Sequence, residues 1–160
     1  MIISNWNKVV NDHDYVIHLG DVILGKDSEL SSIMERLNGT KILCRGNHDH
    51  HSDVWYMERG FDFVCDYYIY NDLAFSHAPL TPLPYQTVKH KNREEGFIKQ
   101  PVKLNIHGHF HRGEHRGQPG MPDSYYDHEY FEAMRHKYHL IQIEDKLRPQ
   151  SLSQILSKYD

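Results

Sequence analysis

Four apolar runs of this chain each end in polar residues that can bind a metal ion. The segments that close these runs are Gly20-Asp21, Gly46-Asn47-His48-Asp49, Ser76-His77 and Gly108-His109-Phe110-His111. Short apolar runs bounded by turn residues are typical of buried β-strands. In layered α/β folds, ligands bind just beyond the carboxyl ends of parallel strands. The pattern therefore predicts an α/β fold in which four distant segments supply one site.

Residues 14–44 predict the first unit of such a fold. Residues 15–19 form an apolar run, residues 26–39 carry apolar side chains at helical spacing, and residues 41–44 are apolar again. Two strands joined by a helix in this way are usually parallel neighbours in one sheet. We therefore expect these two strands to pair in parallel.

The remaining segments give weaker local signals. Helical spacing marks three of them, residues 1–10, 52–60 and 151–159. A hairpin turn is expected at Asn71-Asp72, and two further strands are expected over residues 102–111 and 138–144. Two segments are expected to be irregular, residues 79–101, which hold four prolines, and residues 112–137, which show no clear period.

Length and charge limit the class of protein. A chain of 160 residues is long enough for one domain with its own core. The formal net charge of −4 disfavours a protein that coats nucleic acid through many lysine and arginine contacts. No apolar run reaches the roughly 20 residues of a membrane span, and the start lacks a signal-peptide pattern. We therefore expect a cytoplasmic protein, away from membranes, with Cys44 and Cys65 as free thiols.

The residue types at the four strand ends fit a divalent transition metal. Carboxylate, amide oxygen and imidazole are present, without a thiolate, in the candidate ligands Asp21, Asn47, His77, His109 and His111. That mixture suits Mn²⁺, Fe²⁺ or Zn²⁺ better than a structural cysteine–zinc site. Each motif alone is also an ordinary turn sequence. Their occurrence in order, each after an apolar strand, is what favours a metal site.

The motifs HLGD, GNHD, SHAP and HGHFH, in this order, closely resemble those of the calcineurin-like metallophosphoesterases. The resemblance covers roughly residues 5–111, and RPQSLSQIL is similar to the tail of small bacterial and phage members. It implies a four-layer α-β-β-α sandwich, with two β-sheets between helices. It also implies a two-metal site that hydrolyses phosphate esters.

Carried over by position, the resemblance gives each metal ligand a role. Asp21 would be the carboxylate that bridges the two ions, and Asn47, His77 and His109 would complete one of the two metal sites. His111 would belong to the other.

The same resemblance assigns the catalytic and substrate-binding groups. His48 would lie beside the leaving group, with help from Asp49, and Asn47 and His48 would contact the substrate. Acid catalysis by such a histidine is typically worth about 10²–10⁴-fold in rate.

The N-terminal region departs from the family pattern. Family members open with an apolar strand that ends in Asp-x-His and supplies two ligands to the ion of His111. This chain begins inside the following helix, so we expect a single, N-terminally shortened domain over residues 1–160 that holds one or two ions. His13, His50 and His51 are the candidates to replace a missing ligand.

Two functions follow from this departure. The first is hydrolysis of a phosphodiester or phosphomonoester by metal-activated water, impaired by loss of the first motif. The second is a weak or inactive binding or scaffold module with the same fold. The expected partner is a small phosphate-ester substrate, with nucleotides among the candidates. A homodimer is also expected, because a sheet without a central strand exposes edges that pair with another chain.

Overall fold

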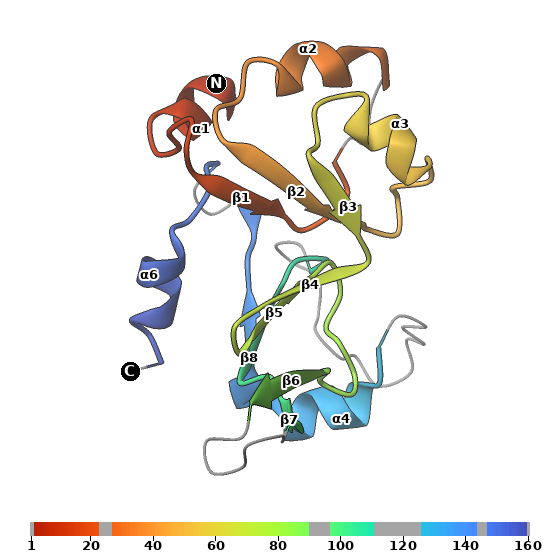
Figure 1. The fold of residues 1–160 in the computed structure, drawn as a ribbon, viewed down its shortest axis with the longest axis vertical. Helices are drawn as coiled ribbons and strands as arrows, with labels where there is room; N and C mark the ends of the chain where they lie inside the picture. The colour runs from red at the N-terminus through yellow and green to blue at the C-terminus, as the bar shows by residue number, and fades with distance from the viewer. Residues whose placement is uncertain (1, 23–26, 90–96, 111–125, 144–146, 160) are drawn as a thin grey trace.

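The computed structural model describes residues 2–22, 27–89, 97–110, 126–143 and 147–159. It shows a mixed α/β fold with three sheets, flanked by short helices (Figure 1). Among the described residues, no helix is both long and apolar enough to cross a membrane.

The first sheet has three parallel strands in the order β1-β2-β3. Its strands are β1 (Tyr15–His18), β2 (Thr40–Cys44) and β3 (Phe63–Cys65). The parallel pairing of β1 with β2 confirms the predicted strand–helix–strand unit. The helical part of that unit is shorter than predicted. Only Leu30–Met34 forms the α-helix α2, which follows the 3₁₀ turn η1 at Asp27–Glu29.

The second sheet has four strands in the order β4-β5-β8-β9. They are β4 (Tyr67–Tyr70), β5 (Leu73–Ser76), β8 (Leu104–His107) and β9 (Tyr138–Leu140). β4 and β5 are antiparallel, which confirms the hairpin at Asn71-Asp72. β5, β8 and β9 are parallel neighbours, so the ends of β5 and β8 lie side by side.

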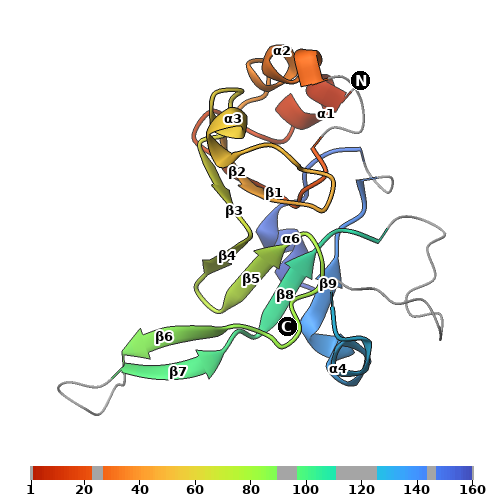
Figure 2. The same ribbon diagram turned by 90° about the vertical axis from the view of Figure 1, so that its right-hand side faces the viewer.

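The segment 79–101 is not a loop throughout, and that prediction was wrong. β6 (Tyr85–Lys89) and β7 (Phe97–Pro101) form an antiparallel ribbon that projects from the rest of the protein (Figure 2). Pro84 precedes the first strand and Pro101 ends the second, so neither ring interrupts the middle of a strand. Prolines at strand ends are compatible with pairing.

Four short α-helices complete the described structure besides α2. They are α1 (Ile2–Asn7), α3 (Asp53–Met57), α4 (His128–Ala133) and α6 (Leu152–Leu156), with a 3₁₀ turn, η2, at Arg135–Lys137. Ser52, Asp127 and Ser151 cap α3, α4 and α6 by accepting a backbone N–H three residues ahead. Helix α4 falls in the part of 112–137 that was predicted to be irregular, so that prediction was wrong there.

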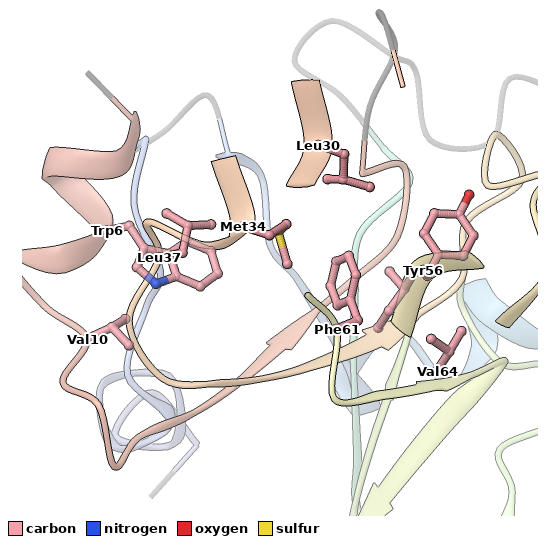
Figure 3. Packing of buried hydrophobic residues seen from close by; sticks show 9 residues of the cluster. Trp6, Val10, Leu30, Met34, Leu37, Tyr56, Phe61 and Val64 are labelled. Carbon is pink, nitrogen blue, oxygen red and sulfur yellow. The ribbon is translucent and has the colours of Figure 1, made fainter. Parts of the chain in front are cut away.

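The helices α1, α2 and α3 cover one face of the first sheet (Figure 1). Between these helices and the sheet lies a buried apolar cluster, called here the helical cluster and drawn in Figure 3. It contains Trp6, Val10, Leu30, Met34, Leu37, Leu43, Tyr56, Phe61 and Val64. Leu43 points into this cluster, while its neighbour Cys44 points to the opposite face of the sheet. This alternation is the period of two expected for a strand buried on both faces.

The opposite face of the first sheet packs on the second sheet. This inter-sheet cluster contains Cys44, Leu73, Phe75, Leu104, Ile106 and Ile155, so α6 also contributes. A third cluster lies on the far face of the second sheet, where Ala74 packs with Phe131 of α4. The two sheets thus pack against each other through this cluster, and the loops after β1, β2, β5 and β8 are brought together.

Candidate functional site

The loop after β1 passes so close to its neighbours that only glycine fits at one position. Gly20 has a φ of 84° and Asp21 a φ of 52°, both in the left-handed region. A Cβ atom on Gly20 would lie 2.7 Å from the Gly46 Cα and 2.7 Å from the His77 Nδ1. The loops after β1 and β2 and the end of β5 are therefore in direct contact.

The Asp49 carboxylate ties the loops after β1 and β2 together. Its Oδ2 accepts hydrogen bonds from the backbone N–H groups of Asp21, at 2.8 Å, and Gly46, at 2.7 Å. Its Oδ1 accepts from the backbone N–H of Val22, at 3.0 Å, and from the Tyr56 hydroxyl, at 3.5 Å. Hydrogen bonds to a charged acceptor are stronger than neutral ones. Asp49 therefore fixes the position of Asp21.

The tautomer of His77 follows from its contact with a backbone carbonyl. Its Nδ1 lies 2.7 Å from the Leu19 oxygen, which can only accept a hydrogen bond. Nδ1 therefore carries a proton. In the neutral imidazole, Nε2 then has a lone pair, as a metal-binding nitrogen requires.

Three other side chains converge on that nitrogen. The His77 Nε2 lies 2.9 Å from the Asn47 Oδ1, 3.0 Å from the His109 Nδ1 and 3.4 Å from the Asp21 Oδ2. These groups come from the ends of β1, β2, β5 and β8, the four junctions singled out in the sequence. The structure thus brings together four of the five candidate ligands.

The electrostatics of this cluster keep the imidazole of His77 neutral. Burial lowers the pKa of His77, and the Leu19 carbonyl and the Asp21 carboxylate raise it by less. His77 is therefore neutral near pH 7, and its lone pair faces the Asn47 oxygen and the Asp21 carboxylate. A proton on the His109 Nδ1 would allow a hydrogen bond between the two imidazole rings. The Asn47 Oδ1 and the Asp21 Oδ2 also lie close to the His77 Nε2.

The donor types are those that divalent transition ions bind in proteins. Two donors on one ion, each at about 2.0–2.2 Å and at right or tetrahedral angles, are about 2.8–3.6 Å apart. The separations of 2.9, 3.0 and 3.4 Å from the His77 Nε2 lie in that range. Within the described ranges, no three His, Cys, Asp or Glu side chains alone have the arrangement of a metal site. A metal site at this position would therefore have to use the amide oxygen of Asn47 as well.

Two of the four side chains stand on a strained backbone. Asp21 has a φ of 52° and His109 a φ of 69°, a region that non-glycine residues enter at a cost of about 1–3 kcal/mol. Such strain collects at functional sites, where surrounding contacts hold it in place. For Asp21 the holding contact is its N–H bond to Asp49.

The remaining predicted site residues occupy different positions. His48 is exposed beside the cluster, and its backbone N–H donates to the Asp21 Oδ1 at 3.0 Å. The Asp49 oxygens face backbone amides and the Tyr56 hydroxyl, so Asp49 acts here by holding loops. The His111 prediction falls outside the described residues.

The candidates for a replacement ligand lie away from the cluster or engage other partners. The His51 Nε2 pairs with the Asp27 Oδ2 at 2.8 Å, and its ring stacks on Trp55 at 3.8 Å between centroids. The His50 ring is exposed and faces His48 edge-on at 6.4 Å. His13 is exposed in the loop before β1.

Sequence reasoning missed Tyr56, and His18 at the end of β1 is a second buried group near the site. The His18 Nδ1 is buried and makes no hydrogen bond within the described structure. Burial lowers the pKa of His18, and Asp49 raises it by less. Tyr56 lies on α3 and reaches Asp49 across the loop. The apolar residues next to Tyr56 in the sequence gave no sign that its hydroxyl would contact Asp49.

Comparisons with known proteins support the fold and leave the activity open. No family model matches the chain. The uncharacterized protein MJ1445 of Methanocaldococcus jannaschii is 48% identical over 50 residues, a match that covers 30% of this chain. The chain spans only 28% of the length of that relative.

A solved structure shares the fold over almost the whole chain. The crystal structure of AQ665 from Aquifex aeolicus, a protein of unknown function, superposes with a TM-score of 0.59 and 24% sequence identity. The match covers 99% of this chain and 83% of that one. At this identity the likeness concerns the fold alone.

Proposed function

We propose that this protein is a metal-dependent phosphoesterase of the calcineurin-like family. The observation that carries the proposal is the convergence of Asp21, Asn47 and His109 on the Nε2 of His77. A carboxylate, an amide oxygen and two imidazoles suit Mn²⁺, Fe²⁺ or Zn²⁺. The four sequence motifs that resemble this family are also the four segments that meet.

The arrangement of layers is consistent with the four-layer α-β-β-α sandwich that we infer for the fold. Helices α1–α3 pack on the outer face of the first sheet through the helical cluster. Helix α4 packs on the outer face of the second sheet through Phe131. The inter-sheet cluster lies between them.

The side chains of the site would divide the work between binding and proton transfer. A bound divalent ion would neutralise phosphoryl oxygens and lower the pKa of a coordinated water. Asp21, Asn47, His77 and His109 would hold that charge at the end of the strands. His48, which is exposed next to Asn47, would give a proton to the leaving alkoxide.

The supporting contacts would keep this arrangement ready for substrate. Asp49 fixes the Asp21 backbone, and the Leu19 carbonyl orients the His77 ring. Fixed donors lose little freedom when the substrate binds, and this preorganisation lowers the barrier. The substrate is then a small phosphate ester whose anionic group faces the cluster.

Hydrolysis of bis-p-nitrophenyl phosphate in the presence of Mn²⁺ tests the proposal. The wild-type protein should release nitrophenol, and Asn47→Ala and His109→Ala should each lose most of the activity. His136→Ala, at an exposed position in η2, is the matched control and should keep it. No hydrolysis with Mn²⁺, Fe²⁺ or Zn²⁺, together with intact ion binding, would favour the binding module instead.

A further inference from the structure

The two cysteines of the chain are register partners on neighbouring strands. Cys44 ends β2, Cys65 ends β3, and the two residues pair directly in the parallel ladder. Both are free thiols, as predicted. They do not belong to the cluster at His77, and the proposed hydrolysis does not use them.

The geometry of the pair suits a covalent bridge. Neighbouring strands lie about 4.7–4.9 Å apart, and disulfides join Cα atoms about 4.4–6.8 Å apart. Register partners in a parallel pair point to the same face of the sheet. Both side chains pack in the inter-sheet cluster, where Cys44 is fully buried and Cys65 is partly exposed.

The two thiols differ in the way that a reactive pair requires. The Cys44 thiol donates to the Phe75 carbonyl at 3.4 Å, and the Cys65 thiol donates to the Leu43 carbonyl at 3.5 Å. The interaction between the two sulfurs raises the pKa of Cys44 and lowers the pKa of Cys65, and burial raises the Cys44 pKa further. Arg45 also stabilises the Cys65 thiolate, against the opposing effects of burial, Asp66 and Asp53. The more acidic sulfur is thus the one that solvent can reach.

We propose that Cys44 and Cys65 form a redox-active dithiol site that reacts with small-molecule disulfides. The Cys65 thiolate attacks one sulfur of a disulfide RSSR, forms a mixed disulfide and releases RS⁻, which takes up a proton as RSH. The Cys44 sulfur then attacks the Cys65 sulfur, closes the intramolecular bond and releases the second RSH. The protein loses two protons and two electrons, and RSSR gains them.

The bridge would close at the base of the loop that carries Asn47. The backbone N–H of Arg45, the next residue after Cys44, donates to the Cys65 carbonyl at 2.9 Å. A covalent link between the two strand ends therefore constrains the point where the loop of residues 45–51 leaves the sheet. The dithiol chemistry stands on its own contacts and needs no ion at His77.

Titration of the purified full chain with oxidised glutathione tests the site. The wild-type protein should lose both free thiols, measured with a chromogenic disulfide reagent, and remain monomer-sized on a non-reducing gel. Its intact mass should fall by two hydrogens, and dithiothreitol should restore both thiols. An unchanged mass, a stable glutathione adduct without closure, or a disulfide-linked dimer would each overturn the proposal.

Two variants separate the roles of the sulfurs. Cys44→Ala should stop at a glutathione adduct on Cys65, because no second thiol can displace it. Cys65→Ala should react at least about tenfold more slowly than Cys44→Ala, because its remaining thiol is buried and has a raised pKa. Equal adduct formation in the two variants would contradict the assignment. Circular dichroism checks that each variant is folded. If a variant does not fold, the titration of the wild-type protein still tests the proposal.

Discussion

The helical cluster on one face of the first sheet and the cluster at His77 beyond the strand ends obey different rules. In the helical cluster, nine buried side chains are mutually compatible, and each contact excludes water. At His77, a carboxylate, an amide oxygen and imidazole nitrogens face one another. The backbone there is also strained at Asp21 and His109. The first region stabilises the fold by apolar burial, whereas the second brings polar groups and strained backbone together at a cost in stability.

This contrast predicts how substitutions behave. Truncation in the helical cluster should cost stability with or without a metal ion. Substitution among the donors at His77 should cost little stability in metal-free protein, and should remove the response to metal. The loop-holding contacts of Asp49 should lie between these two cases, because they serve both the fold and the site.

Leu43→Ala should have the largest effect on the free energy of unfolding. Leu43 is fully buried on β2, and a Leu→Ala change in a core costs about 2–5 kcal/mol because it leaves a cavity. Denaturant unfolding in metal-free buffer measures the loss. Val54→Ala, at a side chain that is 57% exposed, is the control and should change the value by less than about 0.5 kcal/mol. Similar losses in both variants would contradict a special role for the cluster.

Asp49→Ala should rank second, at about 2–3 kcal/mol, because it leaves three backbone N–H groups without their charged acceptor. The control is Asp62→Ala, an exposed aspartate that accepts one backbone bond from Lys41 at 2.7 Å. It should cost about 1 kcal/mol or less. If the two losses were equal, Asp49 would have no special role in holding the loops after β1 and β2.

The free energy of unfolding should depend on pH through the buried histidine His18. Its pKa is lowered in the folded protein, chiefly by burial, whereas an unfolded chain has a histidine pKa of about 6.5. Below that pH the unfolded chain binds a proton that the folded protein does not, so stability falls as the pH falls. The slope from one such group is at most about 1.4 kcal/mol per pH unit. Above about pH 7 the effect should vanish.

His18→Phe isolates this contribution. The ring would keep the edge-on contact with Phe61, which lies 6.1 Å away between centroids, and would lose the titrating nitrogen. Unfolding free energies from pH 7 to pH 5 should therefore fall less steeply in the variant than in the wild type. Parallel curves would show that His18 is protonated equally in both states.

Asp21→Asn should have the smallest effect in metal-free protein, within about 0.5 kcal/mol of wild type and in the stabilising direction. The amide keeps the shape, can still accept the His48 N–H bond, and can donate to the lone pair of His77. Thermal unfolding in the presence of a chelator measures this. A loss above about 2 kcal/mol would mean that the carboxylate is a structural group.

The position of the site at the strand ends could be predicted from the sequence, because it depends on local patterns. Each apolar run ends at a polar group, and parallel pairing brings together the ends of β1 and β2 in one sheet and those of β5 and β8 in the other. The pairing of Cys44 with Cys65 could not be predicted, because it depends on the register of β2 against β3. A shift of one residue would have turned the two side chains to opposite faces.

The contacts of Asp49 were beyond sequence reasoning for a similar reason. They require the loops after β1 and β2 to approach within the space left by Gly20 and Gly46. The ribbon of β6 and β7 was missed because prolines and charges near its ends hid the strand pattern. These are properties of tertiary packing, and no window of local sequence contains them.

The central claim is that Asp21, Asn47, His77 and His109 hold one cation. Equilibrium dialysis of chelator-treated protein against Mn²⁺, with the bound metal measured by elemental analysis, tests it most directly. The wild-type protein and the His136→Ala control should bind at least one ion per chain, and Asp21→Asn and Asn47→Ala should bind far more weakly. Mn²⁺ at about 100 times its dissociation constant should also stabilise the wild type by about 2.7 kcal/mol. No bound Mn²⁺ in the wild type, or equal binding in all four proteins, would contradict the account.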